Sequence, residues 1–141
     1  MAELLDLVRA HHRGVLVTLK RDGRPQLSNV GHHLDEAGEV LRISVTDDRA
    51  KTRNLRRDPR ATYHVTTADL GAYAVVEGTA TLSDVAADPH DATVDELVQL
   101  YRDLAGEHSD WAEFRAAMVA DRRLVLRVSV DRVYGWAGAN S

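Results

Sequence analysis

Apolar residues recur along the chain with a period of two in some segments and with helical spacing in others. Alternating or β-branched runs predict strands at residues 14–19, 25–34, 39–46, 61–67, 72–82 and 123–136. Asp22-Gly23 between the first two runs predicts a tight hairpin, and Gly78 within the fifth predicts a bend or bulge. Strands in this order indicate an antiparallel sheet that closes into a barrel, which would remove its exposed edges.

Four helices are predicted, three from apolar spacing at residues 3–12, 91–105 and 109–121, and one at residues 49–57 from the residues that would begin and end it. For the last helix, Ser109 or Asp110 can serve as N-cap, with Glu113 completing a capping-box pattern. Residues 84–121 hold two cations against ten anions. We expect this stretch to be a helical insertion within a single domain that spans residues 1–141.

Composition and charge exclude several classes of protein. The 141 residues include no cysteine, which rules out disulfides and thiolate metal sites. No run approaches the roughly 20 apolar residues of a membrane helix, and the first residues do not resemble a secretory signal. We therefore expect a cytoplasmic protein without a membrane partner. The net charge of −4 argues against a general nucleic-acid binder, which is normally basic overall.

Positive charge is nevertheless concentrated in one short segment. Six of the 18 cations lie within twelve residues: Arg49, Lys51, Arg53, Arg56, Arg57 and Arg60. Such a local concentration suits a small anionic ligand better than a nucleic acid.

The cationic segment begins where a helix is expected to start. Asp47 or Asp48 can cap that helix, and Pro59 ends it. Lys51 and Thr52 then lie in the first turn, beside free backbone amides and the positive end of the helix dipole. These features together predict a phosphate site.

The same helix also has a simpler interpretation. Leu55 must turn inward, with Thr52 or Asn54 nearby, so some arginines must face water. On the residues alone, a solvated helix without a ligand fits as well as a phosphate site.

Other constellations do not indicate chemistry of their own. His32 and His33 are adjacent in a predicted strand and point to opposite faces, so we expect no metal site and favour an exposed polar position for them. There is no nucleophile-elbow motif and no G-x-G-x-x-G fingerprint, which argues against a hydrolase and a Rossmann nicotinamide site. No side chain is predicted to be an obligatory catalytic acid or base.

The order of motifs "GVLVTLKRDGRPQLSNV … ISVTDDRAKTRNLRRDPRA … YAVVEGTA … DRVYGW" resembles the pyridoxamine 5′-phosphate oxidase-like superfamily. Within it, the chain is most similar to the actinobacterial branch that uses the deazaflavin coenzyme F-420. The resemblance runs from about Leu7 to Tyr134, and "GRPQLSNV" with "AKTRNLRRDPRA" are its most specific parts. It implies a mainly β (α+β) fold, an antiparallel six-stranded split β-barrel with short flanking helices. It also implies a homodimer with two cofactor sites between the subunits.

The resemblance assigns residues to the cofactor. It places the cofactor phosphate at Arg49, Lys51 and Thr52. It places the ring against the second and third strands, at Gln26, Leu27, Ser28, Asn29 and Ser44.

The resemblance also identifies Arg56, Arg57 and Arg60 as candidates to bind the carboxylates of the F-420 polyglutamate tail. One departure affects the substrate side: Gly71 stands where relatives often carry an aromatic residue, and Tyr73 is the nearest substitute. The implied activity is hydride transfer from reduced F-420 to an unsaturated organic substrate. The alternatives are an FMN-dependent enzyme of the pyridoxamine 5′-phosphate oxidase type and a non-catalytic F-420 carrier.

Overall fold

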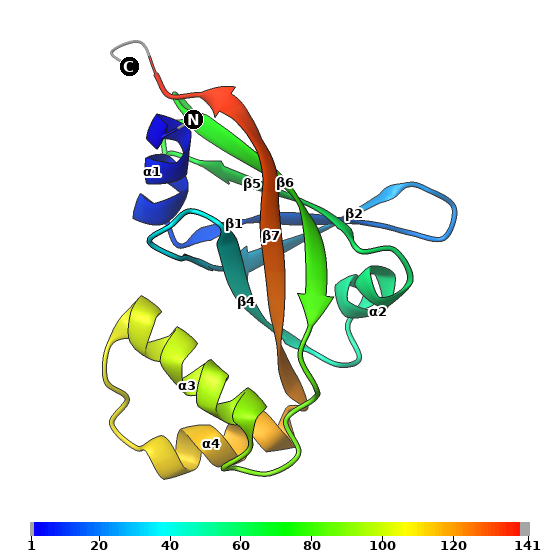
Figure 1. Ribbon diagram of the computed structural model, residues 1–141, viewed down its shortest axis with the longest axis vertical. Helices are drawn as coiled ribbons and strands as arrows, with labels where there is room; N and C mark the ends of the chain where they lie inside the picture. Colours follow the sequence, from blue (N-terminus) through cyan, green and yellow to red (C-terminus); the bar gives the residue numbers. More distant parts are fainter. Residues whose placement is uncertain (1, 139–141) are drawn as a thin grey trace.

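The computed structural model describes residues 2–138, whose backbone forms a strongly curled antiparallel sheet flanked by helices (Figure 1). The strands are β1 (Arg13–Leu19), β2 (Pro25–Gly31), β3 (His33–Leu34), β4 (Val40–Thr46), β5 (Arg60–Thr66), β6 (Tyr73–Leu82) and β7 (Arg123–Trp136). The helices are α1 (Ala2–Ala10), α2 (Ala50–Arg57), α3 (Ala92–Ala105) and α4 (Trp111–Ala120). The elements predicted from periodicity are all present, and the mainly β fold class is confirmed.

The strand order is β2-β1-β5-β6-β7-β4-β3, and every neighbouring pair is antiparallel. The hydrogen-bonded ladder ends at β2 and β3, which the chain joins directly through His32. The sheet is therefore a split barrel, and the full closure expected from strand order alone is not reached.

A break at His32 explains why seven strands replace the expected six. The His32 side chain is fully buried. Its Nε2 lies 2.7 Å from the carbonyl oxygen of Val8 in α1, and its Nδ1 bonds the hydroxyl of Tyr63 in β5. Turning this ring inward interrupts the run predicted at 25–34. The expectation of an exposed position for His32 is wrong.

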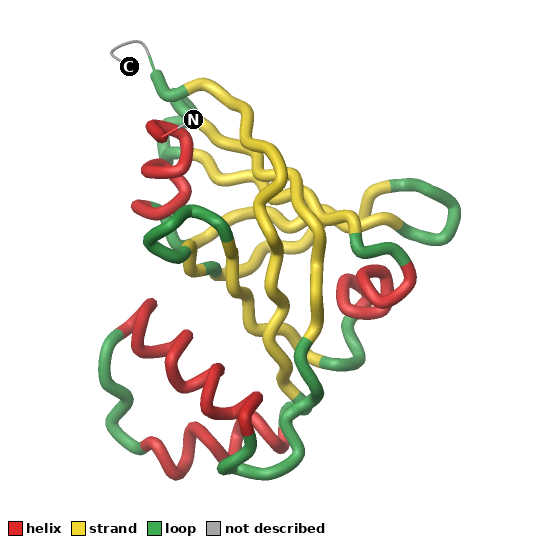
Figure 2. The backbone as a smooth tube through the Cα atoms, viewed as in Figure 1, coloured by secondary structure: helices red, strands yellow, loops and turns green. Residues whose placement is uncertain are grey.

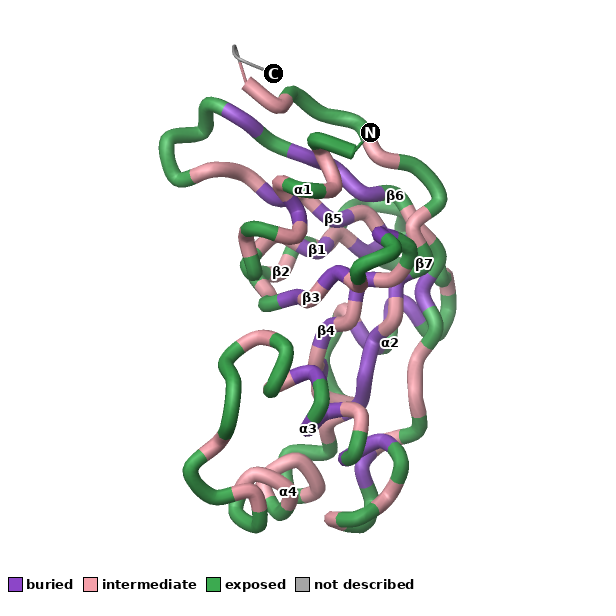
Figure 3. Tube along the Cα trace, turned by 60° about the vertical axis from the view of Figure 1, so that its left-hand side comes forward, coloured by how far each residue is buried: buried purple, intermediate pink, exposed green. Residues whose placement is uncertain are grey.

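The core lies inside the curled sheet and includes Leu16, Tyr63, Val76 and Leu126. Figure 3 shows the buried segments of the strands in purple. The bend predicted at Gly78 is a β-bulge, because the register between β6 and β7 shifts between Glu77 and Gly78. A Cβ at Gly78 would collide with the carbonyl oxygen of Ser129 on β7, so the close approach of the two strands requires glycine.

The acidic insertion forms α3 and α4, which lie together at one end of the sheet, far from α1 (Figure 2). Asp110 caps α4 as one of the two predicted candidates, because its carboxylate accepts a bond from the Glu113 amide. Two ion pairs fix α3 to the sheet. Arg127 of β7 pairs with Glu96, and Nη2 of Arg42 in β4 lies 2.5 Å from Oδ2 of Asp103. Between residues 2 and 138, no helix combines the length and the apolar character needed to cross a membrane.

Candidate functional site: a cationic pocket beside a wide cleft

Helix α2 begins at Ala50 without a side-chain cap, with Arg49 at the N-cap position. The predicted aspartate cap is therefore wrong. The carboxylate of Asp47 instead pairs with Arg122 at 2.8 Å and with Arg56 at 2.6 Å. These hydrogen bonds, first that of Arg122 and then that of Arg56, lower the pKa of Asp47. The positive end of the helix dipole thus keeps no carboxylate cap of its own and suits an anionic ligand.

The six cations between residues 49 and 60 divide into two groups. Four are engaged with the chain itself: Arg53 with the Asp48 carbonyl, Arg56 with Asp47, Arg57 with the Leu19 carbonyl and Asn54, and Arg60 with Asp58. Arg49 and Lys51 differ, since neither side chain has an ion pair or hydrogen bond within residues 2–138, and both line the same pocket. Among the six cations of this segment, those without a partner in residues 2–138 therefore lie at the start of α2.

This cationic pocket has a volume of about 290 Å³ and lies between the start of α2, strands β2 and β4, and the first residue of β7. Arg123 adds a third cation, because the antiparallel register places it opposite Thr46. Partial burial lowers the pKa of Lys51, and the charges of Arg49 and Arg123 lower it further. The pocket is thus lined by three mutually repelling cations and by no carboxylate.

Two buried polar atoms of the lining lack a partner in the described part of the chain. They are the Thr46 hydroxyl oxygen and the Arg123 Nε. The Arg123 Nη1 reaches the Ser44 hydroxyl at a distance of 3.4 Å, which is long for a hydrogen bond. Buried polar groups in proteins are normally paired. Together with the three cations, these groups fit a ligand that presents several anionic oxygens, such as a phosphate.

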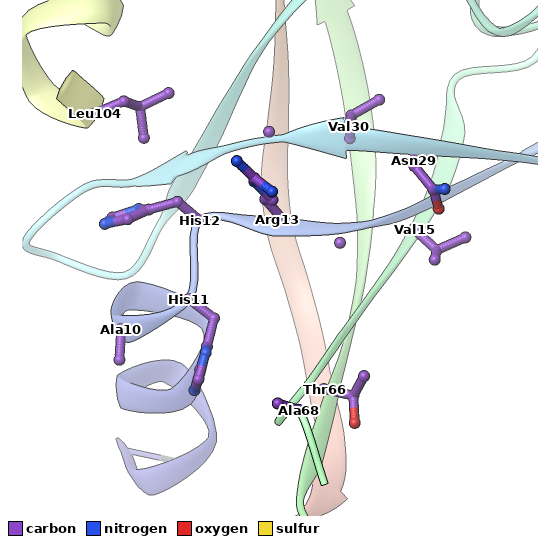
Figure 4. Close-up of a pocket in the computed structure, with 12 residues that line it drawn as sticks. Ala10, His11, His12, Arg13, Val15, Asn29, Val30, Thr66, Ala68 and Leu104 are labelled. Carbon is purple, nitrogen blue, oxygen red and sulfur yellow. The ribbon is translucent and has the colours of Figure 1, made fainter. Parts of the chain in front are cut away.

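A wider cleft of about 1150 Å³ adjoins the cationic pocket, and the two share residues 29–31 of β2 (Figure 4). The cleft is bordered by His11 and His12 after α1, by Val15 of β1, by Thr66 of β5 and by Leu104 of α3. The cationic pocket and the wider cleft thus lie on either side of the same short segment of β2. Within residues 2–138, no group of three or more histidine or carboxylate side chains could hold a metal ion.

Several predicted site residues line neither the cationic pocket nor the cleft of the described chain. Thr52 is fully buried and donates its hydroxyl proton to the Thr46 carbonyl oxygen at 2.7 Å, so that hydroxyl faces away from the pocket. Gln26 bonds Ser28 at 3.0 Å and Thr18 at 3.1 Å, in a side-chain network outside the cleft. The residues predicted to contact the ring thus fall into two sets. Asn29 and Ser44 line the cationic pocket, and Asn29 also lines the cleft, whereas Gln26, Leu27 and Ser28 line neither.

Arg123 is the site residue that sequence reasoning missed. It follows a helix and opens a strand, and nothing in its local sequence distinguishes it from Arg122. Only the pairing of β4 with β7 brings it to Thr46 and Ser44. A sequence signal would have required the register of strands nearly 80 residues apart.

Gly71 lies in the turn between β5 and β6, where its amide donates to the Asp69 carboxylate at 2.8 Å. It does not border the cleft. The neighbouring Leu70 is exposed, and the ring centroid of Tyr73 lies 5.8 Å from that of His64. An aromatic side chain is therefore available on this side of the sheet, two residues later than expected.

Comparison with known proteins places this geometry in a family. The sequence model described as pyridoxamine 5′-phosphate oxidase matches residues 1–137. A solved structure described as an F420 reductase is 28% identical, with a TM-score of 0.68, over 92% of this chain and 94% of its own. A conserved hypothetical protein from Mycobacterium tuberculosis is 22% identical, with a TM-score of 0.73, over 96% of this chain and 82% of its own. A putative pyridoxamine 5′-phosphate oxidase from Listeria innocua is 20% identical, with a TM-score of 0.68, over 99% and 98%. The chain belongs to the pyridoxamine 5′-phosphate oxidase family and has its split-barrel fold.

Proposed function

We propose that the protein is an oxidoreductase that binds coenzyme F-420 and passes a hydride from its reduced form to an unsaturated organic acceptor. One observation carries the proposal: the only cations of the 49–60 segment without partners in residues 2–138, Arg49 and Lys51, line a pocket together with Arg123, and this pocket shares residues 29–31 with the cleft. A molecule with a phosphate at one point and a planar ring beside it matches that arrangement.

The coenzyme phosphate would be held by Arg49, Lys51 and Arg123, with the Thr46 hydroxyl as an additional donor. A phosphate bound among these three cations would offset their mutual repulsion, which gives the pocket a strong preference for an anion. The ring would lie in the cleft beside Asn29. The bound deazaflavin supplies the hydride, while the chain binds and orients it and restricts access of water.

The choice of F-420 over FMN rests on its polyanionic tail and on the relative described as an F420 reductase. Both coenzymes carry a phosphate, so Lys51 alone does not distinguish them. Of the arginines predicted to bind the tail, Arg56, Arg57 and Arg60 already have partners in the chain. We infer that Arg49, which is exposed and unpaired among the described residues, makes the first tail contact, and that the other three take part by exchanging partners.

We further propose that the protein is a homodimer. Leu27, Tyr73, Tyr134 and Trp136 are exposed large side chains, with Leu27 at 59% and Trp136 at 57%. Strand register puts them on the same outer face of the sheet, opposite the core. An apolar face of this kind, next to a cleft open on one side, fits a second copy that completes the cofactor site. The expected mass in solution is twice 15.6 kDa.

A titration tests the cofactor assignment. Purified protein is titrated with F-420, with F-420 lacking its glutamate tail, and with FMN, at two salt concentrations. We expect F-420 to bind most tightly and to lose its advantage over the tailless form at high salt, because exposed charge contacts are screened over roughly 10 Å. Tighter binding of FMN would favour the FMN-dependent alternative. Binding of reduced F-420 without oxidation by any of a panel of enones, quinones and nitroaromatics would favour a carrier.

A further inference from the structure

A second cavity, of about 400 Å³, lies where helices α3 and α4 pack against the sheet. Most of its lining is apolar and comes from the insertion: Leu97, Leu100 and Leu104 of α3, and Phe114 and Met118 of α4. Ligand sites in proteins are typically about 300–1,000 Å³ and mostly apolar, with few polar groups. The cavity meets both criteria.

Arg123 is the one charged residue of this lining, and Ser44 is beside it. The Nε of Arg123 is buried without a partner, and no carboxylate pairs with this guanidinium in residues 2–138. Neighbouring arginines differ in this respect, since Arg122 pairs with Asp47 and Arg127 with Glu96. A partly buried cation without a counterion is unfavourable unless a ligand provides the anion.

Contacts with the sheet and between the two helices hold the walls of the cavity in place. The pairs Arg127–Glu96 and Arg42–Asp103 hold α3 against the sheet from two strands. The ring centroids of Phe114 in α4 and Tyr101 in α3 lie 5.1 Å apart, so these two side chains pack the two helices together. A preformed cavity costs a ligand less ordering than one that must open.

We propose that this cavity binds an amphipathic carboxylate, with its apolar body between α3 and α4 and its carboxylate at Arg123. The apolar lining does not suit the phosphate or the glutamates of a coenzyme, and Arg49 and Lys51 do not border it. Arg123 borders both the cavity and the cationic pocket, and its guanidinium has five N–H donors, enough to serve both. The site therefore lies beside the proposed phosphate position and does not depend on the redox function.

Calorimetry on cofactor-free protein with octanoate and octanol tests the proposal. The two ligands share one apolar body and differ in charge. We expect one octanoate per chain, bound at least tenfold more tightly than octanol. The carboxylate of octanoate can form a charged hydrogen bond with the Arg123 guanidinium, whereas the hydroxyl of octanol carries no charge. Equal binding of the two, or no saturable binding of octanoate, would overturn the proposal.

Two pairs of variants locate the ligand, each checked first for unchanged thermal unfolding. Ala105→Trp places a large ring at the exposed rim of the cavity, whereas Ala116→Trp makes the same change on an exposed position of α4 outside it. We expect the first to abolish octanoate binding and the second to retain it. Arg123→Met should weaken octanoate at least tenfold without affecting octanol, and Lys51→Met should affect neither. Equal loss within either pair would show that the ligand is bound elsewhere.

Discussion

The buried imidazole of His32 makes stability depend on pH in a way that can be calculated. Burial, as the largest cause, lowers the pKa of His32 from 6.5 to about 4; the hydrogen bond to Val8 opposes this shift, and the charges of nearby histidines, His12 foremost, contribute to it. Nε2–H donates to the Val8 carbonyl, so Nδ1 accepts from the Tyr63 hydroxyl. This pairing satisfies both nitrogens of the neutral ring, and burial makes the charged ring unfavourable.

The sign follows from proton uptake in the two states. Between pH 6.5 and about 4 the unfolded chain binds a proton at His32 and the folded chain does not. Stability is therefore fully present above pH 6.5 and falls as the pH is lowered. Each pH unit in this window costs about 1.4 kcal/mol. The loss from this residue should reach about 2 kcal/mol at pH 5 and about 3 kcal/mol at pH 4 and below.

Urea unfolding at pH 7, 6 and 5 measures this effect. His32→Gln removes the titrating group, and its lower starting stability does not matter because the readout is the slope against pH. His90→Gln is the matched control, since His90 is exposed. We expect the wild type and His90→Gln to share a steep slope and His32→Gln to show a shallower one, by about 2 kcal/mol between pH 7 and pH 5. Identical slopes in all three proteins would refute the reasoning.

Two further predictions concern the framework that holds the site. Gly78→Ala should lower the free energy of unfolding by about 1–3 kcal/mol in urea titrations, because a Cβ there collides with the Ser129 carbonyl; unchanged stability would contradict the assigned bulge. Asp110→Ala should cost about 1 kcal/mol by loss of the α4 cap, whereas Ser109→Ala should cost little; equal effects on the thermal midpoint would show that the cap is not the cause.

The break between β2 and β3 shows what periodicity in a sequence does and does not determine. The sequence predicted a single strand over residues 25–34, and nothing in its pattern marks a break at His32. The partners that draw this ring inward are Val8 and Tyr63, which lie 24 and 31 residues away in the sequence. Contacts between residues so far apart cannot be inferred from the local sequence. The strand predicted at residues 25–34 is therefore two strands in the structure, β2 and β3.

The cationic segment shows the same limit for the site. The sequence located the segment at the start of a helix, with Leu55 turned inward as predicted. It did not determine which cations are free, because Asp47 and Asp58 select their partners only in the folded chain. Arg123 joins the pocket through the register of β4 with β7. The sequence therefore pointed to Arg49 and Lys51, but it did not separate them from four arginines whose side chains bond other parts of the chain.

Binding of F-420 to Lys51→Ala and Arg53→Ala, measured by calorimetry beside the wild type, tests the central claim most directly. Both residues are cations of α2, but Lys51 lines the pocket, whereas Arg53 is exposed and donates to the Asp48 carbonyl. A hydrogen bond to a charged group contributes about 1.5–3 kcal/mol, so Lys51→Ala should weaken binding by about ten- to a hundredfold. Alanine favours the helix at both positions, so the fold should be retained. The account predicts a much smaller loss for Arg53→Ala, and equal losses, or none for Lys51→Ala, would contradict it.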